Sequence, residues 1–243
     1  MTAPDDPLQL RIGRKLGSRY VVQGLIGAGS EGSVYRIADP STGIQRAAKI
    51  FRPGYDTRSR RSTQHARKLN HLRRCDIVLQ YLHSETVAVR GEKLTALISE
   101  LCEGVPLQTF IEQHPGKRLP PYMALHVLAA LTEGLAEVHA LGEYHADVHT
   151  ENILIQPRGV RFELKLIDFY EWGKTTKAKQ EQDILDTTRV LYDMLGGRPH
   201  YAKQPAPVRH ICAGLQHKRI LQRFPTIAAL NTHLHNFPWE TMR

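Results

Sequence analysis

The sequence predicts an α+β chain, with strands in its first hundred residues and helices in most of the rest. Up to about residue 101, short apolar runs alternate with turns rich in glycine, proline and aspartate, which is typical of antiparallel strands. From Leu119-Pro120 to about Leu141, apolar residues recur every three to four positions, which is typical of a long amphipathic helix. The two patterns divide the chain into a strand-rich part and a helical part.

The first predicted strand begins at residues 20–22 and leads into a glycine-rich turn. Gly27, Gly29 and Gly32 make a Gly-x-Gly-x-x-Gly pattern, which dinucleotide-binding folds also contain. A dinucleotide fold would open a helix here, whereas residues 34–38 have the pattern of a second strand. The turn therefore joins two strands.

The remaining elements follow from periodicity and from turn residues. A strand is predicted at residues 45–51, followed by a helix at 62–72 and a hairpin whose turn is Gly91-Glu92-Lys93. Three more helices are predicted in the last third of the chain: 182–195, 208–215 and 226–234.

Composition limits the class of protein. A chain of 243 residues with 41% hydrophobic and 23% charged residues can bury a sizeable core. No apolar run approaches the length of a membrane span, and residues 1–17 predict a flexible leader without a secretory signal. Three scattered cysteines predict a reducing compartment, and hence a cytoplasmic protein without disulfides or a zinc site.

The net charge of +9 is distributed along the chain and is densest between residues 58 and 74. On a helix, such a run more often makes a solvated face than a binding surface, and no aromatic residues interleave with it. We therefore expect no nucleic-acid partner.

Residues 144–170 carry the strongest candidate site. Two short apolar runs, 153–155 and 164–167, flank a turn predicted at Gln156–Gly159, so they predict a hairpin. Such a hairpin would bring Asn152 and Asp168 close together at one end. Carboxylate and amide oxygens suit a hard cation such as Mg²⁺.

This stretch resembles the catalytic core of the protein kinases. The family pattern is His-Arg-Asp, four residues, Asn and then Asp-Phe-Gly, and His145, Asp147, Asn152, Asp168 and Phe169 stand at the matching positions. The glycine-rich turn between two strands likewise resembles the kinase loop that covers ATP phosphates. The resemblance extends from about residue 20 to residue 234, and is to the eukaryotic-like Ser/Thr kinases, as a compact, atypical bacterial or effector-like member.

The resemblance implies a bilobal kinase-like domain at residues 18–243, with an N-lobe at about 18–101 and a mainly helical C-lobe at 102–243. It implies ATP and Mg²⁺, or Mn²⁺, as cofactors, and a protein substrate as partner. The implied catalytic residues are Asp147, Lys49 and His149, and the implied metal ligands are Asn152 and Asp168. The implied nucleotide contacts are Gly27, Gly29, Gly32, Val34, Ala47, Lys49, Glu100, Cys102 and Leu154.

Several positions depart from the family pattern. His65 falls where a helix glutamate usually pairs with the lysine, so Asp168, Gln64 or a neutral His65 is the expected partner of Lys49. Ala146 replaces the arginine of His-Arg-Asp, and Tyr170 replaces the glycine after Phe169. The usual Ala-Pro-Glu is missing, and the segment after the predicted central helix is too short for a substrate-docking helix.

Three functions remain open at this point. A Ser/Thr protein kinase is favoured, because Lys49, Asp147, Asn152 and Asp168 are all present. A catalytically inactive binding module would fit the departures at the helix glutamate and after Phe169. A small-molecule kinase would fit Asp-x-His-x-x-Asn around His149, which resembles the loop of aminoglycoside and sugar kinases.

Overall fold

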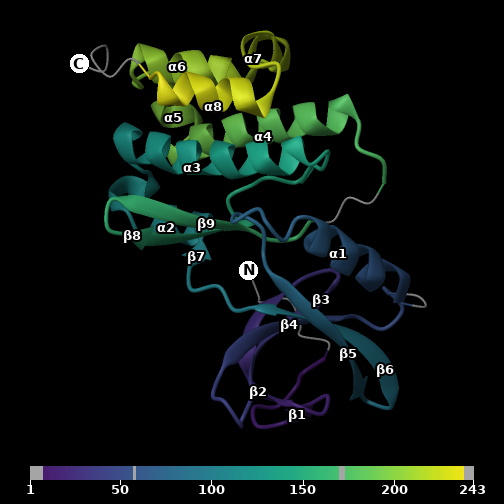
Figure 1. Cartoon of the computed structure of the whole chain (residues 1–243). Coiled ribbons are helices and arrows are strands. Elements are labelled where there is room, and N and C mark those ends of the chain that lie inside the picture. The colour runs from purple at the N-terminus through teal and green to yellow at the C-terminus, as the bar shows by residue number, and fades with distance from the viewer. Residues whose placement is uncertain (1–7, 57–58, 170–172, 238–243) are drawn as a thin grey trace. The chain divides into compact units, whose positions relative to one another are not determined.

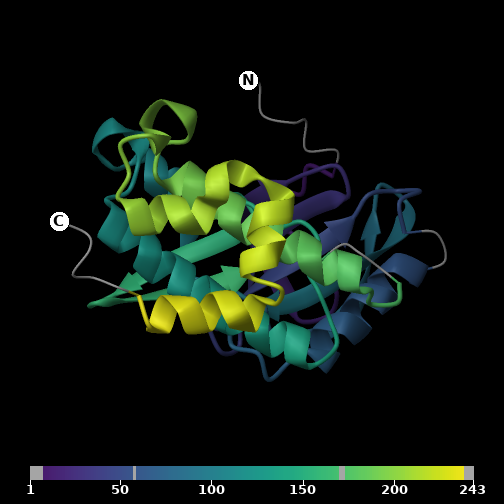
Figure 2. The same ribbon diagram turned by 90° about the horizontal axis from the view of Figure 1, so that it is seen from above.

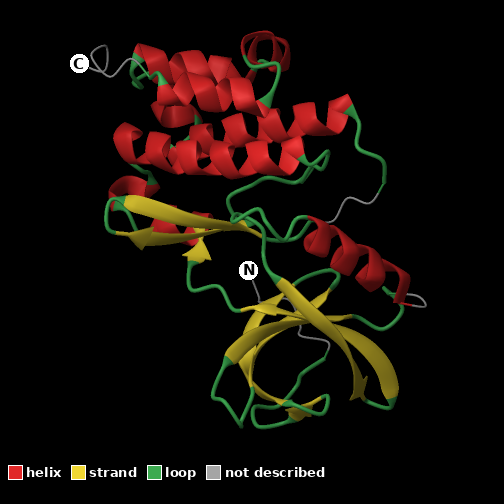
Figure 3. Ribbon diagram, in the orientation of Figure 1, coloured by secondary structure: helices red, strands yellow, loops and turns green. Residues whose placement is uncertain are grey.

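The computed structural model describes residues 8–56, 59–169 and 173–237. The chain divides into two compact units, each considered by itself. The first comprises residues up to Arg73 together with Leu79–Cys102, and the second comprises Arg74–Val78 and everything from Glu103 onward. Strands dominate the first unit and helices the second, as Figure 3 shows. The α+β prediction is confirmed, and the division falls at Cys102, beside the predicted boundary.

The first unit is built on one antiparallel sheet of six strands in the order β1-β2-β3-β4-β6-β5. The strands are β1 (Lys15–Leu16), β2 (Tyr20–Ala28), β3 (Gly32–Ala38), β4 (Gln45–Phe51), β5 (Tyr81–Val89) and β6 (Glu92–Glu100). Among the described residues of this unit, one segment is helical: α1 (Arg60–His71), which packs against β5 and β6 (Figure 1). The predicted strand, turn, strand arrangement around the glycines is therefore present.

The prediction of a flexible leader is wrong for the described residues 8–17. Leu8, Leu10 and Leu16 are buried in the core of the sheet, because a sheet face of this size needs apolar cover. The Gly13 N–H also donates to the carbonyl of Val22, 2.8 Å away, which ties this segment to β2. The sequence analysis missed the segment because five exposed residues, 11–15, separate Leu10 from Leu16 and interrupt the apolar pattern.

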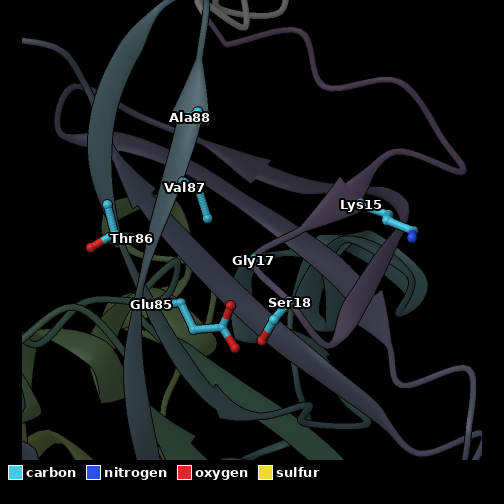
Figure 4. Close-up of a pocket in the computed structure, with 7 residues that line it drawn as sticks. All are labelled: Lys15, Gly17, Ser18, Glu85, Thr86, Val87 and Ala88. Atoms are coloured by element: carbon cyan, nitrogen blue, oxygen red, sulfur yellow. The ribbon is translucent and has the colours of Figure 1, made fainter.

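An open groove lies between the turn after β1 and strand β5, as Figure 4 shows. The carboxylate of Glu85 points there toward Gly17 and Ser18. Gly17 has a φ of 61°, a left-handed conformation that favours glycine, and a Cβ there would displace the Glu85 carboxylate. None of the predicted site residues lines this groove.

The second unit holds a three-stranded sheet in the order β7-β8-β9. Its strands are β7 (Val105–Pro106), β8 (Ile153–Arg158) and β9 (Arg161–Leu166). The predicted hairpin is present, but its turn is shorter than expected. Pairing continues to Arg158↔Arg161, so the reversal occurs at Gly159-Val160, where Gly159 has the positive φ that such a tight turn requires.

Helices make up the rest of the second unit: α2 (Leu107–Glu112), α3 (Pro121–Ala140), α4 (Lys177–Met194), α5 (Arg198–Tyr201), α6 (Ala206–Cys212), α7 (His217–Arg223) and α8 (Ile227–His235). The long helix α3 packs against α4 and α8, which Figures 1 and 2 show from two sides. Its predicted apolar stripe, Leu125, Leu128, Leu131, Leu135 and Val138, is fully buried.

Two details differ from the predicted helices, and a third agrees. Helix α4 begins at Lys177 rather than Gln182, because the Thr176 side chain accepts a hydrogen bond from the Lys179 N–H and caps the helix. Helices α2 and α7 were not predicted, since each is too short to show a clear period. The segment after α4 contains only the single turn α5, as its length had indicated. Within the described residues, no helix has the length and apolar character needed to cross a membrane.

Candidate active site

The loop that carries Asp147 is held by Asp183, a fully buried carboxylate in helix α4. Its two oxygens accept hydrogen bonds from the backbone N–H groups of His145, at 2.9 Å, and Ala146, at 2.6 Å. His139 Nε2 lies 2.8 Å from the same carboxylate. A buried carboxylate needs such donors, and here they fix the backbone immediately before Asp147.

His145 links this loop to the segment before Asp168. Its Nδ1 accepts a hydrogen bond from the Asp147 N–H at 3.2 Å, so the proton of the neutral ring lies on Nε2. That nitrogen donates to the carbonyl of Ile167 at 2.9 Å. The ring also packs on Phe169, with 4.4 Å between ring centroids. The two positions predicted to be structural are thus in contact.

Asp147 and Asn152 form a hydrogen-bonded pair. Asn152 Nδ2 donates to the backbone carbonyl of Asp147 at 3.0 Å and to its Oδ2 at 3.2 Å. The amide nitrogen is thereby occupied, and the amide oxygen keeps its lone pairs for another ligand. The Asp147 side chain is 52% exposed, with His149 Nε2 at 3.5 Å from Oδ2, so the carboxylate can reach an incoming hydroxyl group.

Asp168 lies at the same end of the β8–β9 hairpin as Asn152. The pairing Ile153↔Leu166 brings the residues just beyond it together, and the Ile167 N–H donates to the carbonyl of Asn152 at 3.0 Å. Asp168 has a φ of 63°, a left-handed conformation that is uncommon outside glycine and costs about 1 kcal/mol. Strain of this kind often accompanies residues that must present a side chain in a fixed direction.

These two residues offer one carboxylate and one amide to a cation. Among the residues the structure describes, no group of three or more His, Cys, Asp or Glu side chains could hold a metal. A site with few protein ligands suits Mg²⁺, which keeps several waters and binds phosphate oxygens as well. The residues present therefore fit the predicted ion.

In the first unit, the glycine-rich turn joins β2 and β3. The Gly29 N–H donates to the carbonyl of Gly32 at 2.9 Å. A Cβ on Gly32 would lie 2.1 Å from the Ile50 carbonyl oxygen, so packing against β4 requires glycine there. A Cβ on Gly27 or Gly29 would meet no atom closer than 3.9 Å, so the fold itself does not require glycine at either position. Their lack of a side chain instead leaves space beside the turn, which fits a phosphate group.

Three predicted nucleotide contacts of this unit, Val34, Ala47 and Lys49, share one face of the sheet. Val34 is the register partner of Lys49, and Arg36 is that of Ala47, so residues two apart on each strand project to the same side. Ala47 is also paired with the buried Ser99 on β6. Both Ala47 and Ser99 have small side chains, and both are buried.

The segment that follows β6 is fixed through Glu100. Its backbone N–H donates to the Gln80 carbonyl at 3.0 Å, and its side chain accepts from the Gln80 N–H at 2.8 Å. Cys102 follows at the end of the first unit and is partly buried. Leu154 belongs to the second unit, where it is half-buried in β8 and paired with Pro106.

Lys49 forms an ion pair that the sequence analysis did not predict. Its Nζ lies 2.8 Å from Glu31 Oε2, and the hydroxyl of Tyr55 donates to Glu31 Oε1. The sequence analysis expected the partner on the helix or at Asp168, and so did not predict Glu31. The signal available in the sequence was a glutamate inside the glycine-rich turn, directly before the strand that pairs with the strand of Lys49.

The structure also shows what lies at the helix position that was expected to face Lys49. His65 is buried, and its ring packs edge-on against Phe51 with 6.5 Å between centroids. Helix α1 therefore places an aromatic contact, not a carboxylate, at that position. Tyr170, the other predicted departure, lies outside the described residues.

Comparison with known protein families shows to which family this chain belongs. The family described as the protein kinase domain matches residues 20–202, which includes the glycine turn, Lys49, Asp147, Asn152 and Asp168. The chain belongs to the protein kinase domain family.

Relatives of this kinase domain include two bacterial proteins. Serine/threonine-protein kinase PknA of Mycobacterium tuberculosis is 33% identical over 166 residues, which cover 65% of this chain and 36% of PknA. Serine/threonine-protein kinase PkaB of Streptomyces coelicolor is 32% identical over 151 residues, covering 60% of this chain and 34% of PkaB. The kinase domain thus matches about a third of the length of each relative.

A solved structure shares the fold. The PknI kinase domain of Mycobacterium tuberculosis aligns with a TM-score of 0.68 at 17% identity, covering 93% of this chain and 98% of that one.

The segment that follows Asp168 in this kinase domain is short. Only residues 169–176 separate Asp168 from α4. Near its described end, the Thr175 hydroxyl donates to the carbonyl of Gly142 at 2.5 Å. In the first turn of α4, Lys179 Nζ donates to the Tyr144 hydroxyl at 2.7 Å. The loop of Asp147 therefore has supports within the second unit that need no phosphorylated residue.

Proposed function

We propose that this kinase domain transfers the γ-phosphoryl group of Mg-ATP to the serine or threonine hydroxyl of a protein. The observation that carries the proposal is the Asp147–Asn152 pair, which leaves the Asp147 carboxylate exposed while its loop is fixed by Asp183. A base must be held in place and still reach its substrate, and this arrangement meets both needs. The names of the relatives support the choice of a protein hydroxyl as acceptor.

The second unit would supply the chemistry at the acceptor. Asp147 would orient the hydroxyl and accept its proton, and His149, 3.5 Å from Asp147 Oδ2, would keep that carboxylate in place or contact the transferred group. Asp168 and Asn152 would hold Mg²⁺, or Mn²⁺, which neutralises phosphate charge when bound.

The first unit would bind the nucleotide. Lys49 and the amides of the glycine turn (Gly27, Gly29 and Gly32) would contact the phosphates, since ammonium and N–H groups suit phosphate oxygens. Val34 and Ala47 would pack against the base, and Leu154 is likewise expected to contact the nucleotide. Backbone groups of Glu100 and Cys102 would bind the edge of the adenine.

A cytoplasmic location is also proposed, since none of the three cysteines forms a disulfide in the described structure.

The test is transfer of labelled phosphate from ATP to protein, followed by phosphoamino-acid analysis. We expect phosphoserine or phosphothreonine, and we expect Asp168→Ala to lower the rate by about 100-fold or more in a folded protein. Asp76→Ala is the matched control, because Asp76 is an exposed acid of the same unit outside the predicted site. Full transfer by a folded Asp168→Ala variant would refute the metal assignment.

Other results would point to the two alternatives. Labelling of small hydroxylated compounds but not of proteins would indicate a small-molecule kinase. Binding of ATP without transfer to any acceptor would indicate a binding module.

A further inference from the structure

The ion pair between Lys49 and Glu31 is largely removed from water. The Lys49 side chain is 14% exposed and the Glu31 side chain 11% exposed, with 2.8 Å between Nζ and Oε2. A lysine in such a place needs a carboxylate nearby to keep its charge, because desolvation penalises the ammonium form. Glu31 meets this need within the first unit.

Glu31 is fixed to the lysine's own strand by the backbone. The Arg52 N–H, just beyond β4, donates to the Glu31 carbonyl at 2.8 Å. The next residue, Gly32, is the register partner of Phe51, and Val34 is that of Lys49. These pairings place the base of the Glu31 side chain beside β4, so the carboxylate reaches Lys49 without any help from helix α1.

We propose that Glu31 is a positioning residue that orients Lys49 toward the phosphates, in place of a carboxylate from the helix. The proposal rests on the proposed phosphotransfer, and it adds a residue that the family resemblance does not supply. The glutamate holds the ammonium group in one orientation. The entropy cost of ordering the lysine side chain is therefore not added to the barrier of each reaction.

Tyr55 completes the arrangement. Its hydroxyl donates to Glu31 Oε1, which leaves Oε2 to face Lys49. Burial and the hydrogen bond to Glu31 raise the pKa of Tyr55 to about 12, so the phenol keeps its proton at neutral pH. The Tyr55 ring stacks on Phe51 at 6.1 Å between centroids, and the Phe51 ring lies 5.7 Å from Lys49 Nζ. The carboxylate thus has a fixed donor on one oxygen and the lysine on the other.

The placement has a consequence for regulation. The carboxylate belongs to the turn that is proposed to cover the phosphates, whereas α1 contributes His65 against Phe51. The orientation of Lys49 is therefore expected to depend on the conformation of the glycine turn.

The first experiment measures kcat and the ATP dissociation constant of Glu31→Gln. Glutamine keeps the shape and can still accept a hydrogen bond, but it lacks the charge that fixes the ammonium group. We expect kcat to fall by at least about tenfold while ATP affinity changes by less than about threefold, because orientation matters most in the transition state. Glu92→Gln, an exposed glutamate at the start of β6, is the matched control and should leave both values unchanged.

Two results of this experiment would overturn the proposal. If kcat per folded molecule is unchanged, Glu31 has only a structural role. If ATP binds more tightly and kcat rises, Glu31 competes with the phosphates for Lys49 and restrains the enzyme.

A second variant guards against misfolding of Glu31→Gln. Tyr55→Phe keeps the ring stack on Phe51 and removes only the donor to Glu31, so kcat should fall by about threefold or more through a less ordered carboxylate. Tyr122→Phe, which changes an exposed tyrosine, is its control. An unchanged kcat in Tyr55→Phe would contradict the role given to the carboxylate.

A third measurement separates this proposal from the proposed function. Thermal unfolding of Glu31→Gln, Lys49→Met and the double variant reports the pair without any catalysis. We expect the Tm loss of the double variant to be smaller than the sum of the two single losses, because either substitution alone removes the interaction. Additive losses would overturn the pairing even in an active enzyme. Coupled losses in a protein that transfers no phosphate would leave the pair in place and refute phosphotransfer instead.

Discussion

The carboxylate of Asp183 accepts a hydrogen bond from the backbone N–H of Ala146 across 2.6 Å, and Ala146 has a φ of 69°. A left-handed conformation costs an alanine about 1–2 kcal/mol, so it persists only where other interactions hold it. Asp183 provides those interactions from within helix α4. The consequence is a strained backbone immediately before Asp147, stabilised by a buried charge.

Asp183→Asn should therefore destabilise the protein. An amide can accept a hydrogen bond through its oxygen, but its NH₂ group would face a second backbone N–H of the loop. We expect the free energy of unfolding to fall by about 2–4 kcal/mol, measured by denaturant titration. Asp193→Asn is the matched control in the same helix, because it breaks only an exposed pair with Arg189 and should cost less than about 1 kcal/mol. Equal losses in the two variants would contradict the role of Asp183.

Asp186 has the opposite effect from Asp183: its ionised carboxylate lowers the stability of the folded protein. Burial, together with the nearby charges of Asp183 and Asp147, raises the pKa of Asp186 from 3.8 to about 6, although its carboxylate accepts a hydrogen bond from Gln182 at 2.8 Å. Because the folded state binds this proton more tightly than the unfolded state, ionised Asp186 lowers stability. That cost is absent below pH 4, grows between pH 4 and 6, and is fully present above pH 6.

Asp186→Asn should accordingly stabilise the protein at pH 8 by about 1–2 kcal/mol, allowing for partial solvent screening. The gain should shrink toward zero at pH 4, since the wild-type carboxyl is then neutral in both states. Unfolding free energies of the two proteins at pH 4, 6 and 8 test this. A constant difference across the range would show that Asp186 does not titrate as proposed.

The elements with a clear period could be predicted from the sequence, and those fixed by distant contacts could not. The stripe from Leu125 to Val138 identified α3, because burial of one face dictates its spacing. The leader was misjudged because Leu8 and Leu16 are held by the sheet and not by local periodicity. In the candidate site, motif spacing predicted the loop residues of the second unit. The Glu31–Lys49 pair depends on strand register, which no local motif encodes.

The rate of phosphotransfer should not depend on phosphorylation of the segment after Asp168. A phosphorylated loop needs a cation to receive it, and Ala146 has replaced the arginine that usually does so. The loop of Asp147 is held instead by Asp183 and, through Tyr144, by Lys179. Phosphatase-treated and untreated protein should give the same kcat, with phosphate content checked by mass spectrometry. A tenfold or larger loss after treatment would mean that another basic residue has taken over the arginine's role.

Cys102 should be the most reactive thiol and should be protected by nucleotide. Burial raises the pKa of Cys212 to about 12 and also raises that of Cys75, so neither forms the reactive thiolate readily. Cys102 is only partly buried and is proposed to contact adenine. Iodoacetamide at pH 8, followed by peptide mass spectrometry, should label Cys102 first.

Mg-ATP at ten times its dissociation constant should slow the labelling of Cys102 by about tenfold, because only the nucleotide-free fraction of the protein reacts. Adenosine at saturation should also protect, whereas tripolyphosphate, which lacks the base, should not. Protection by tripolyphosphate alone would place Cys102 near the phosphates and refute its assignment to the adenine edge.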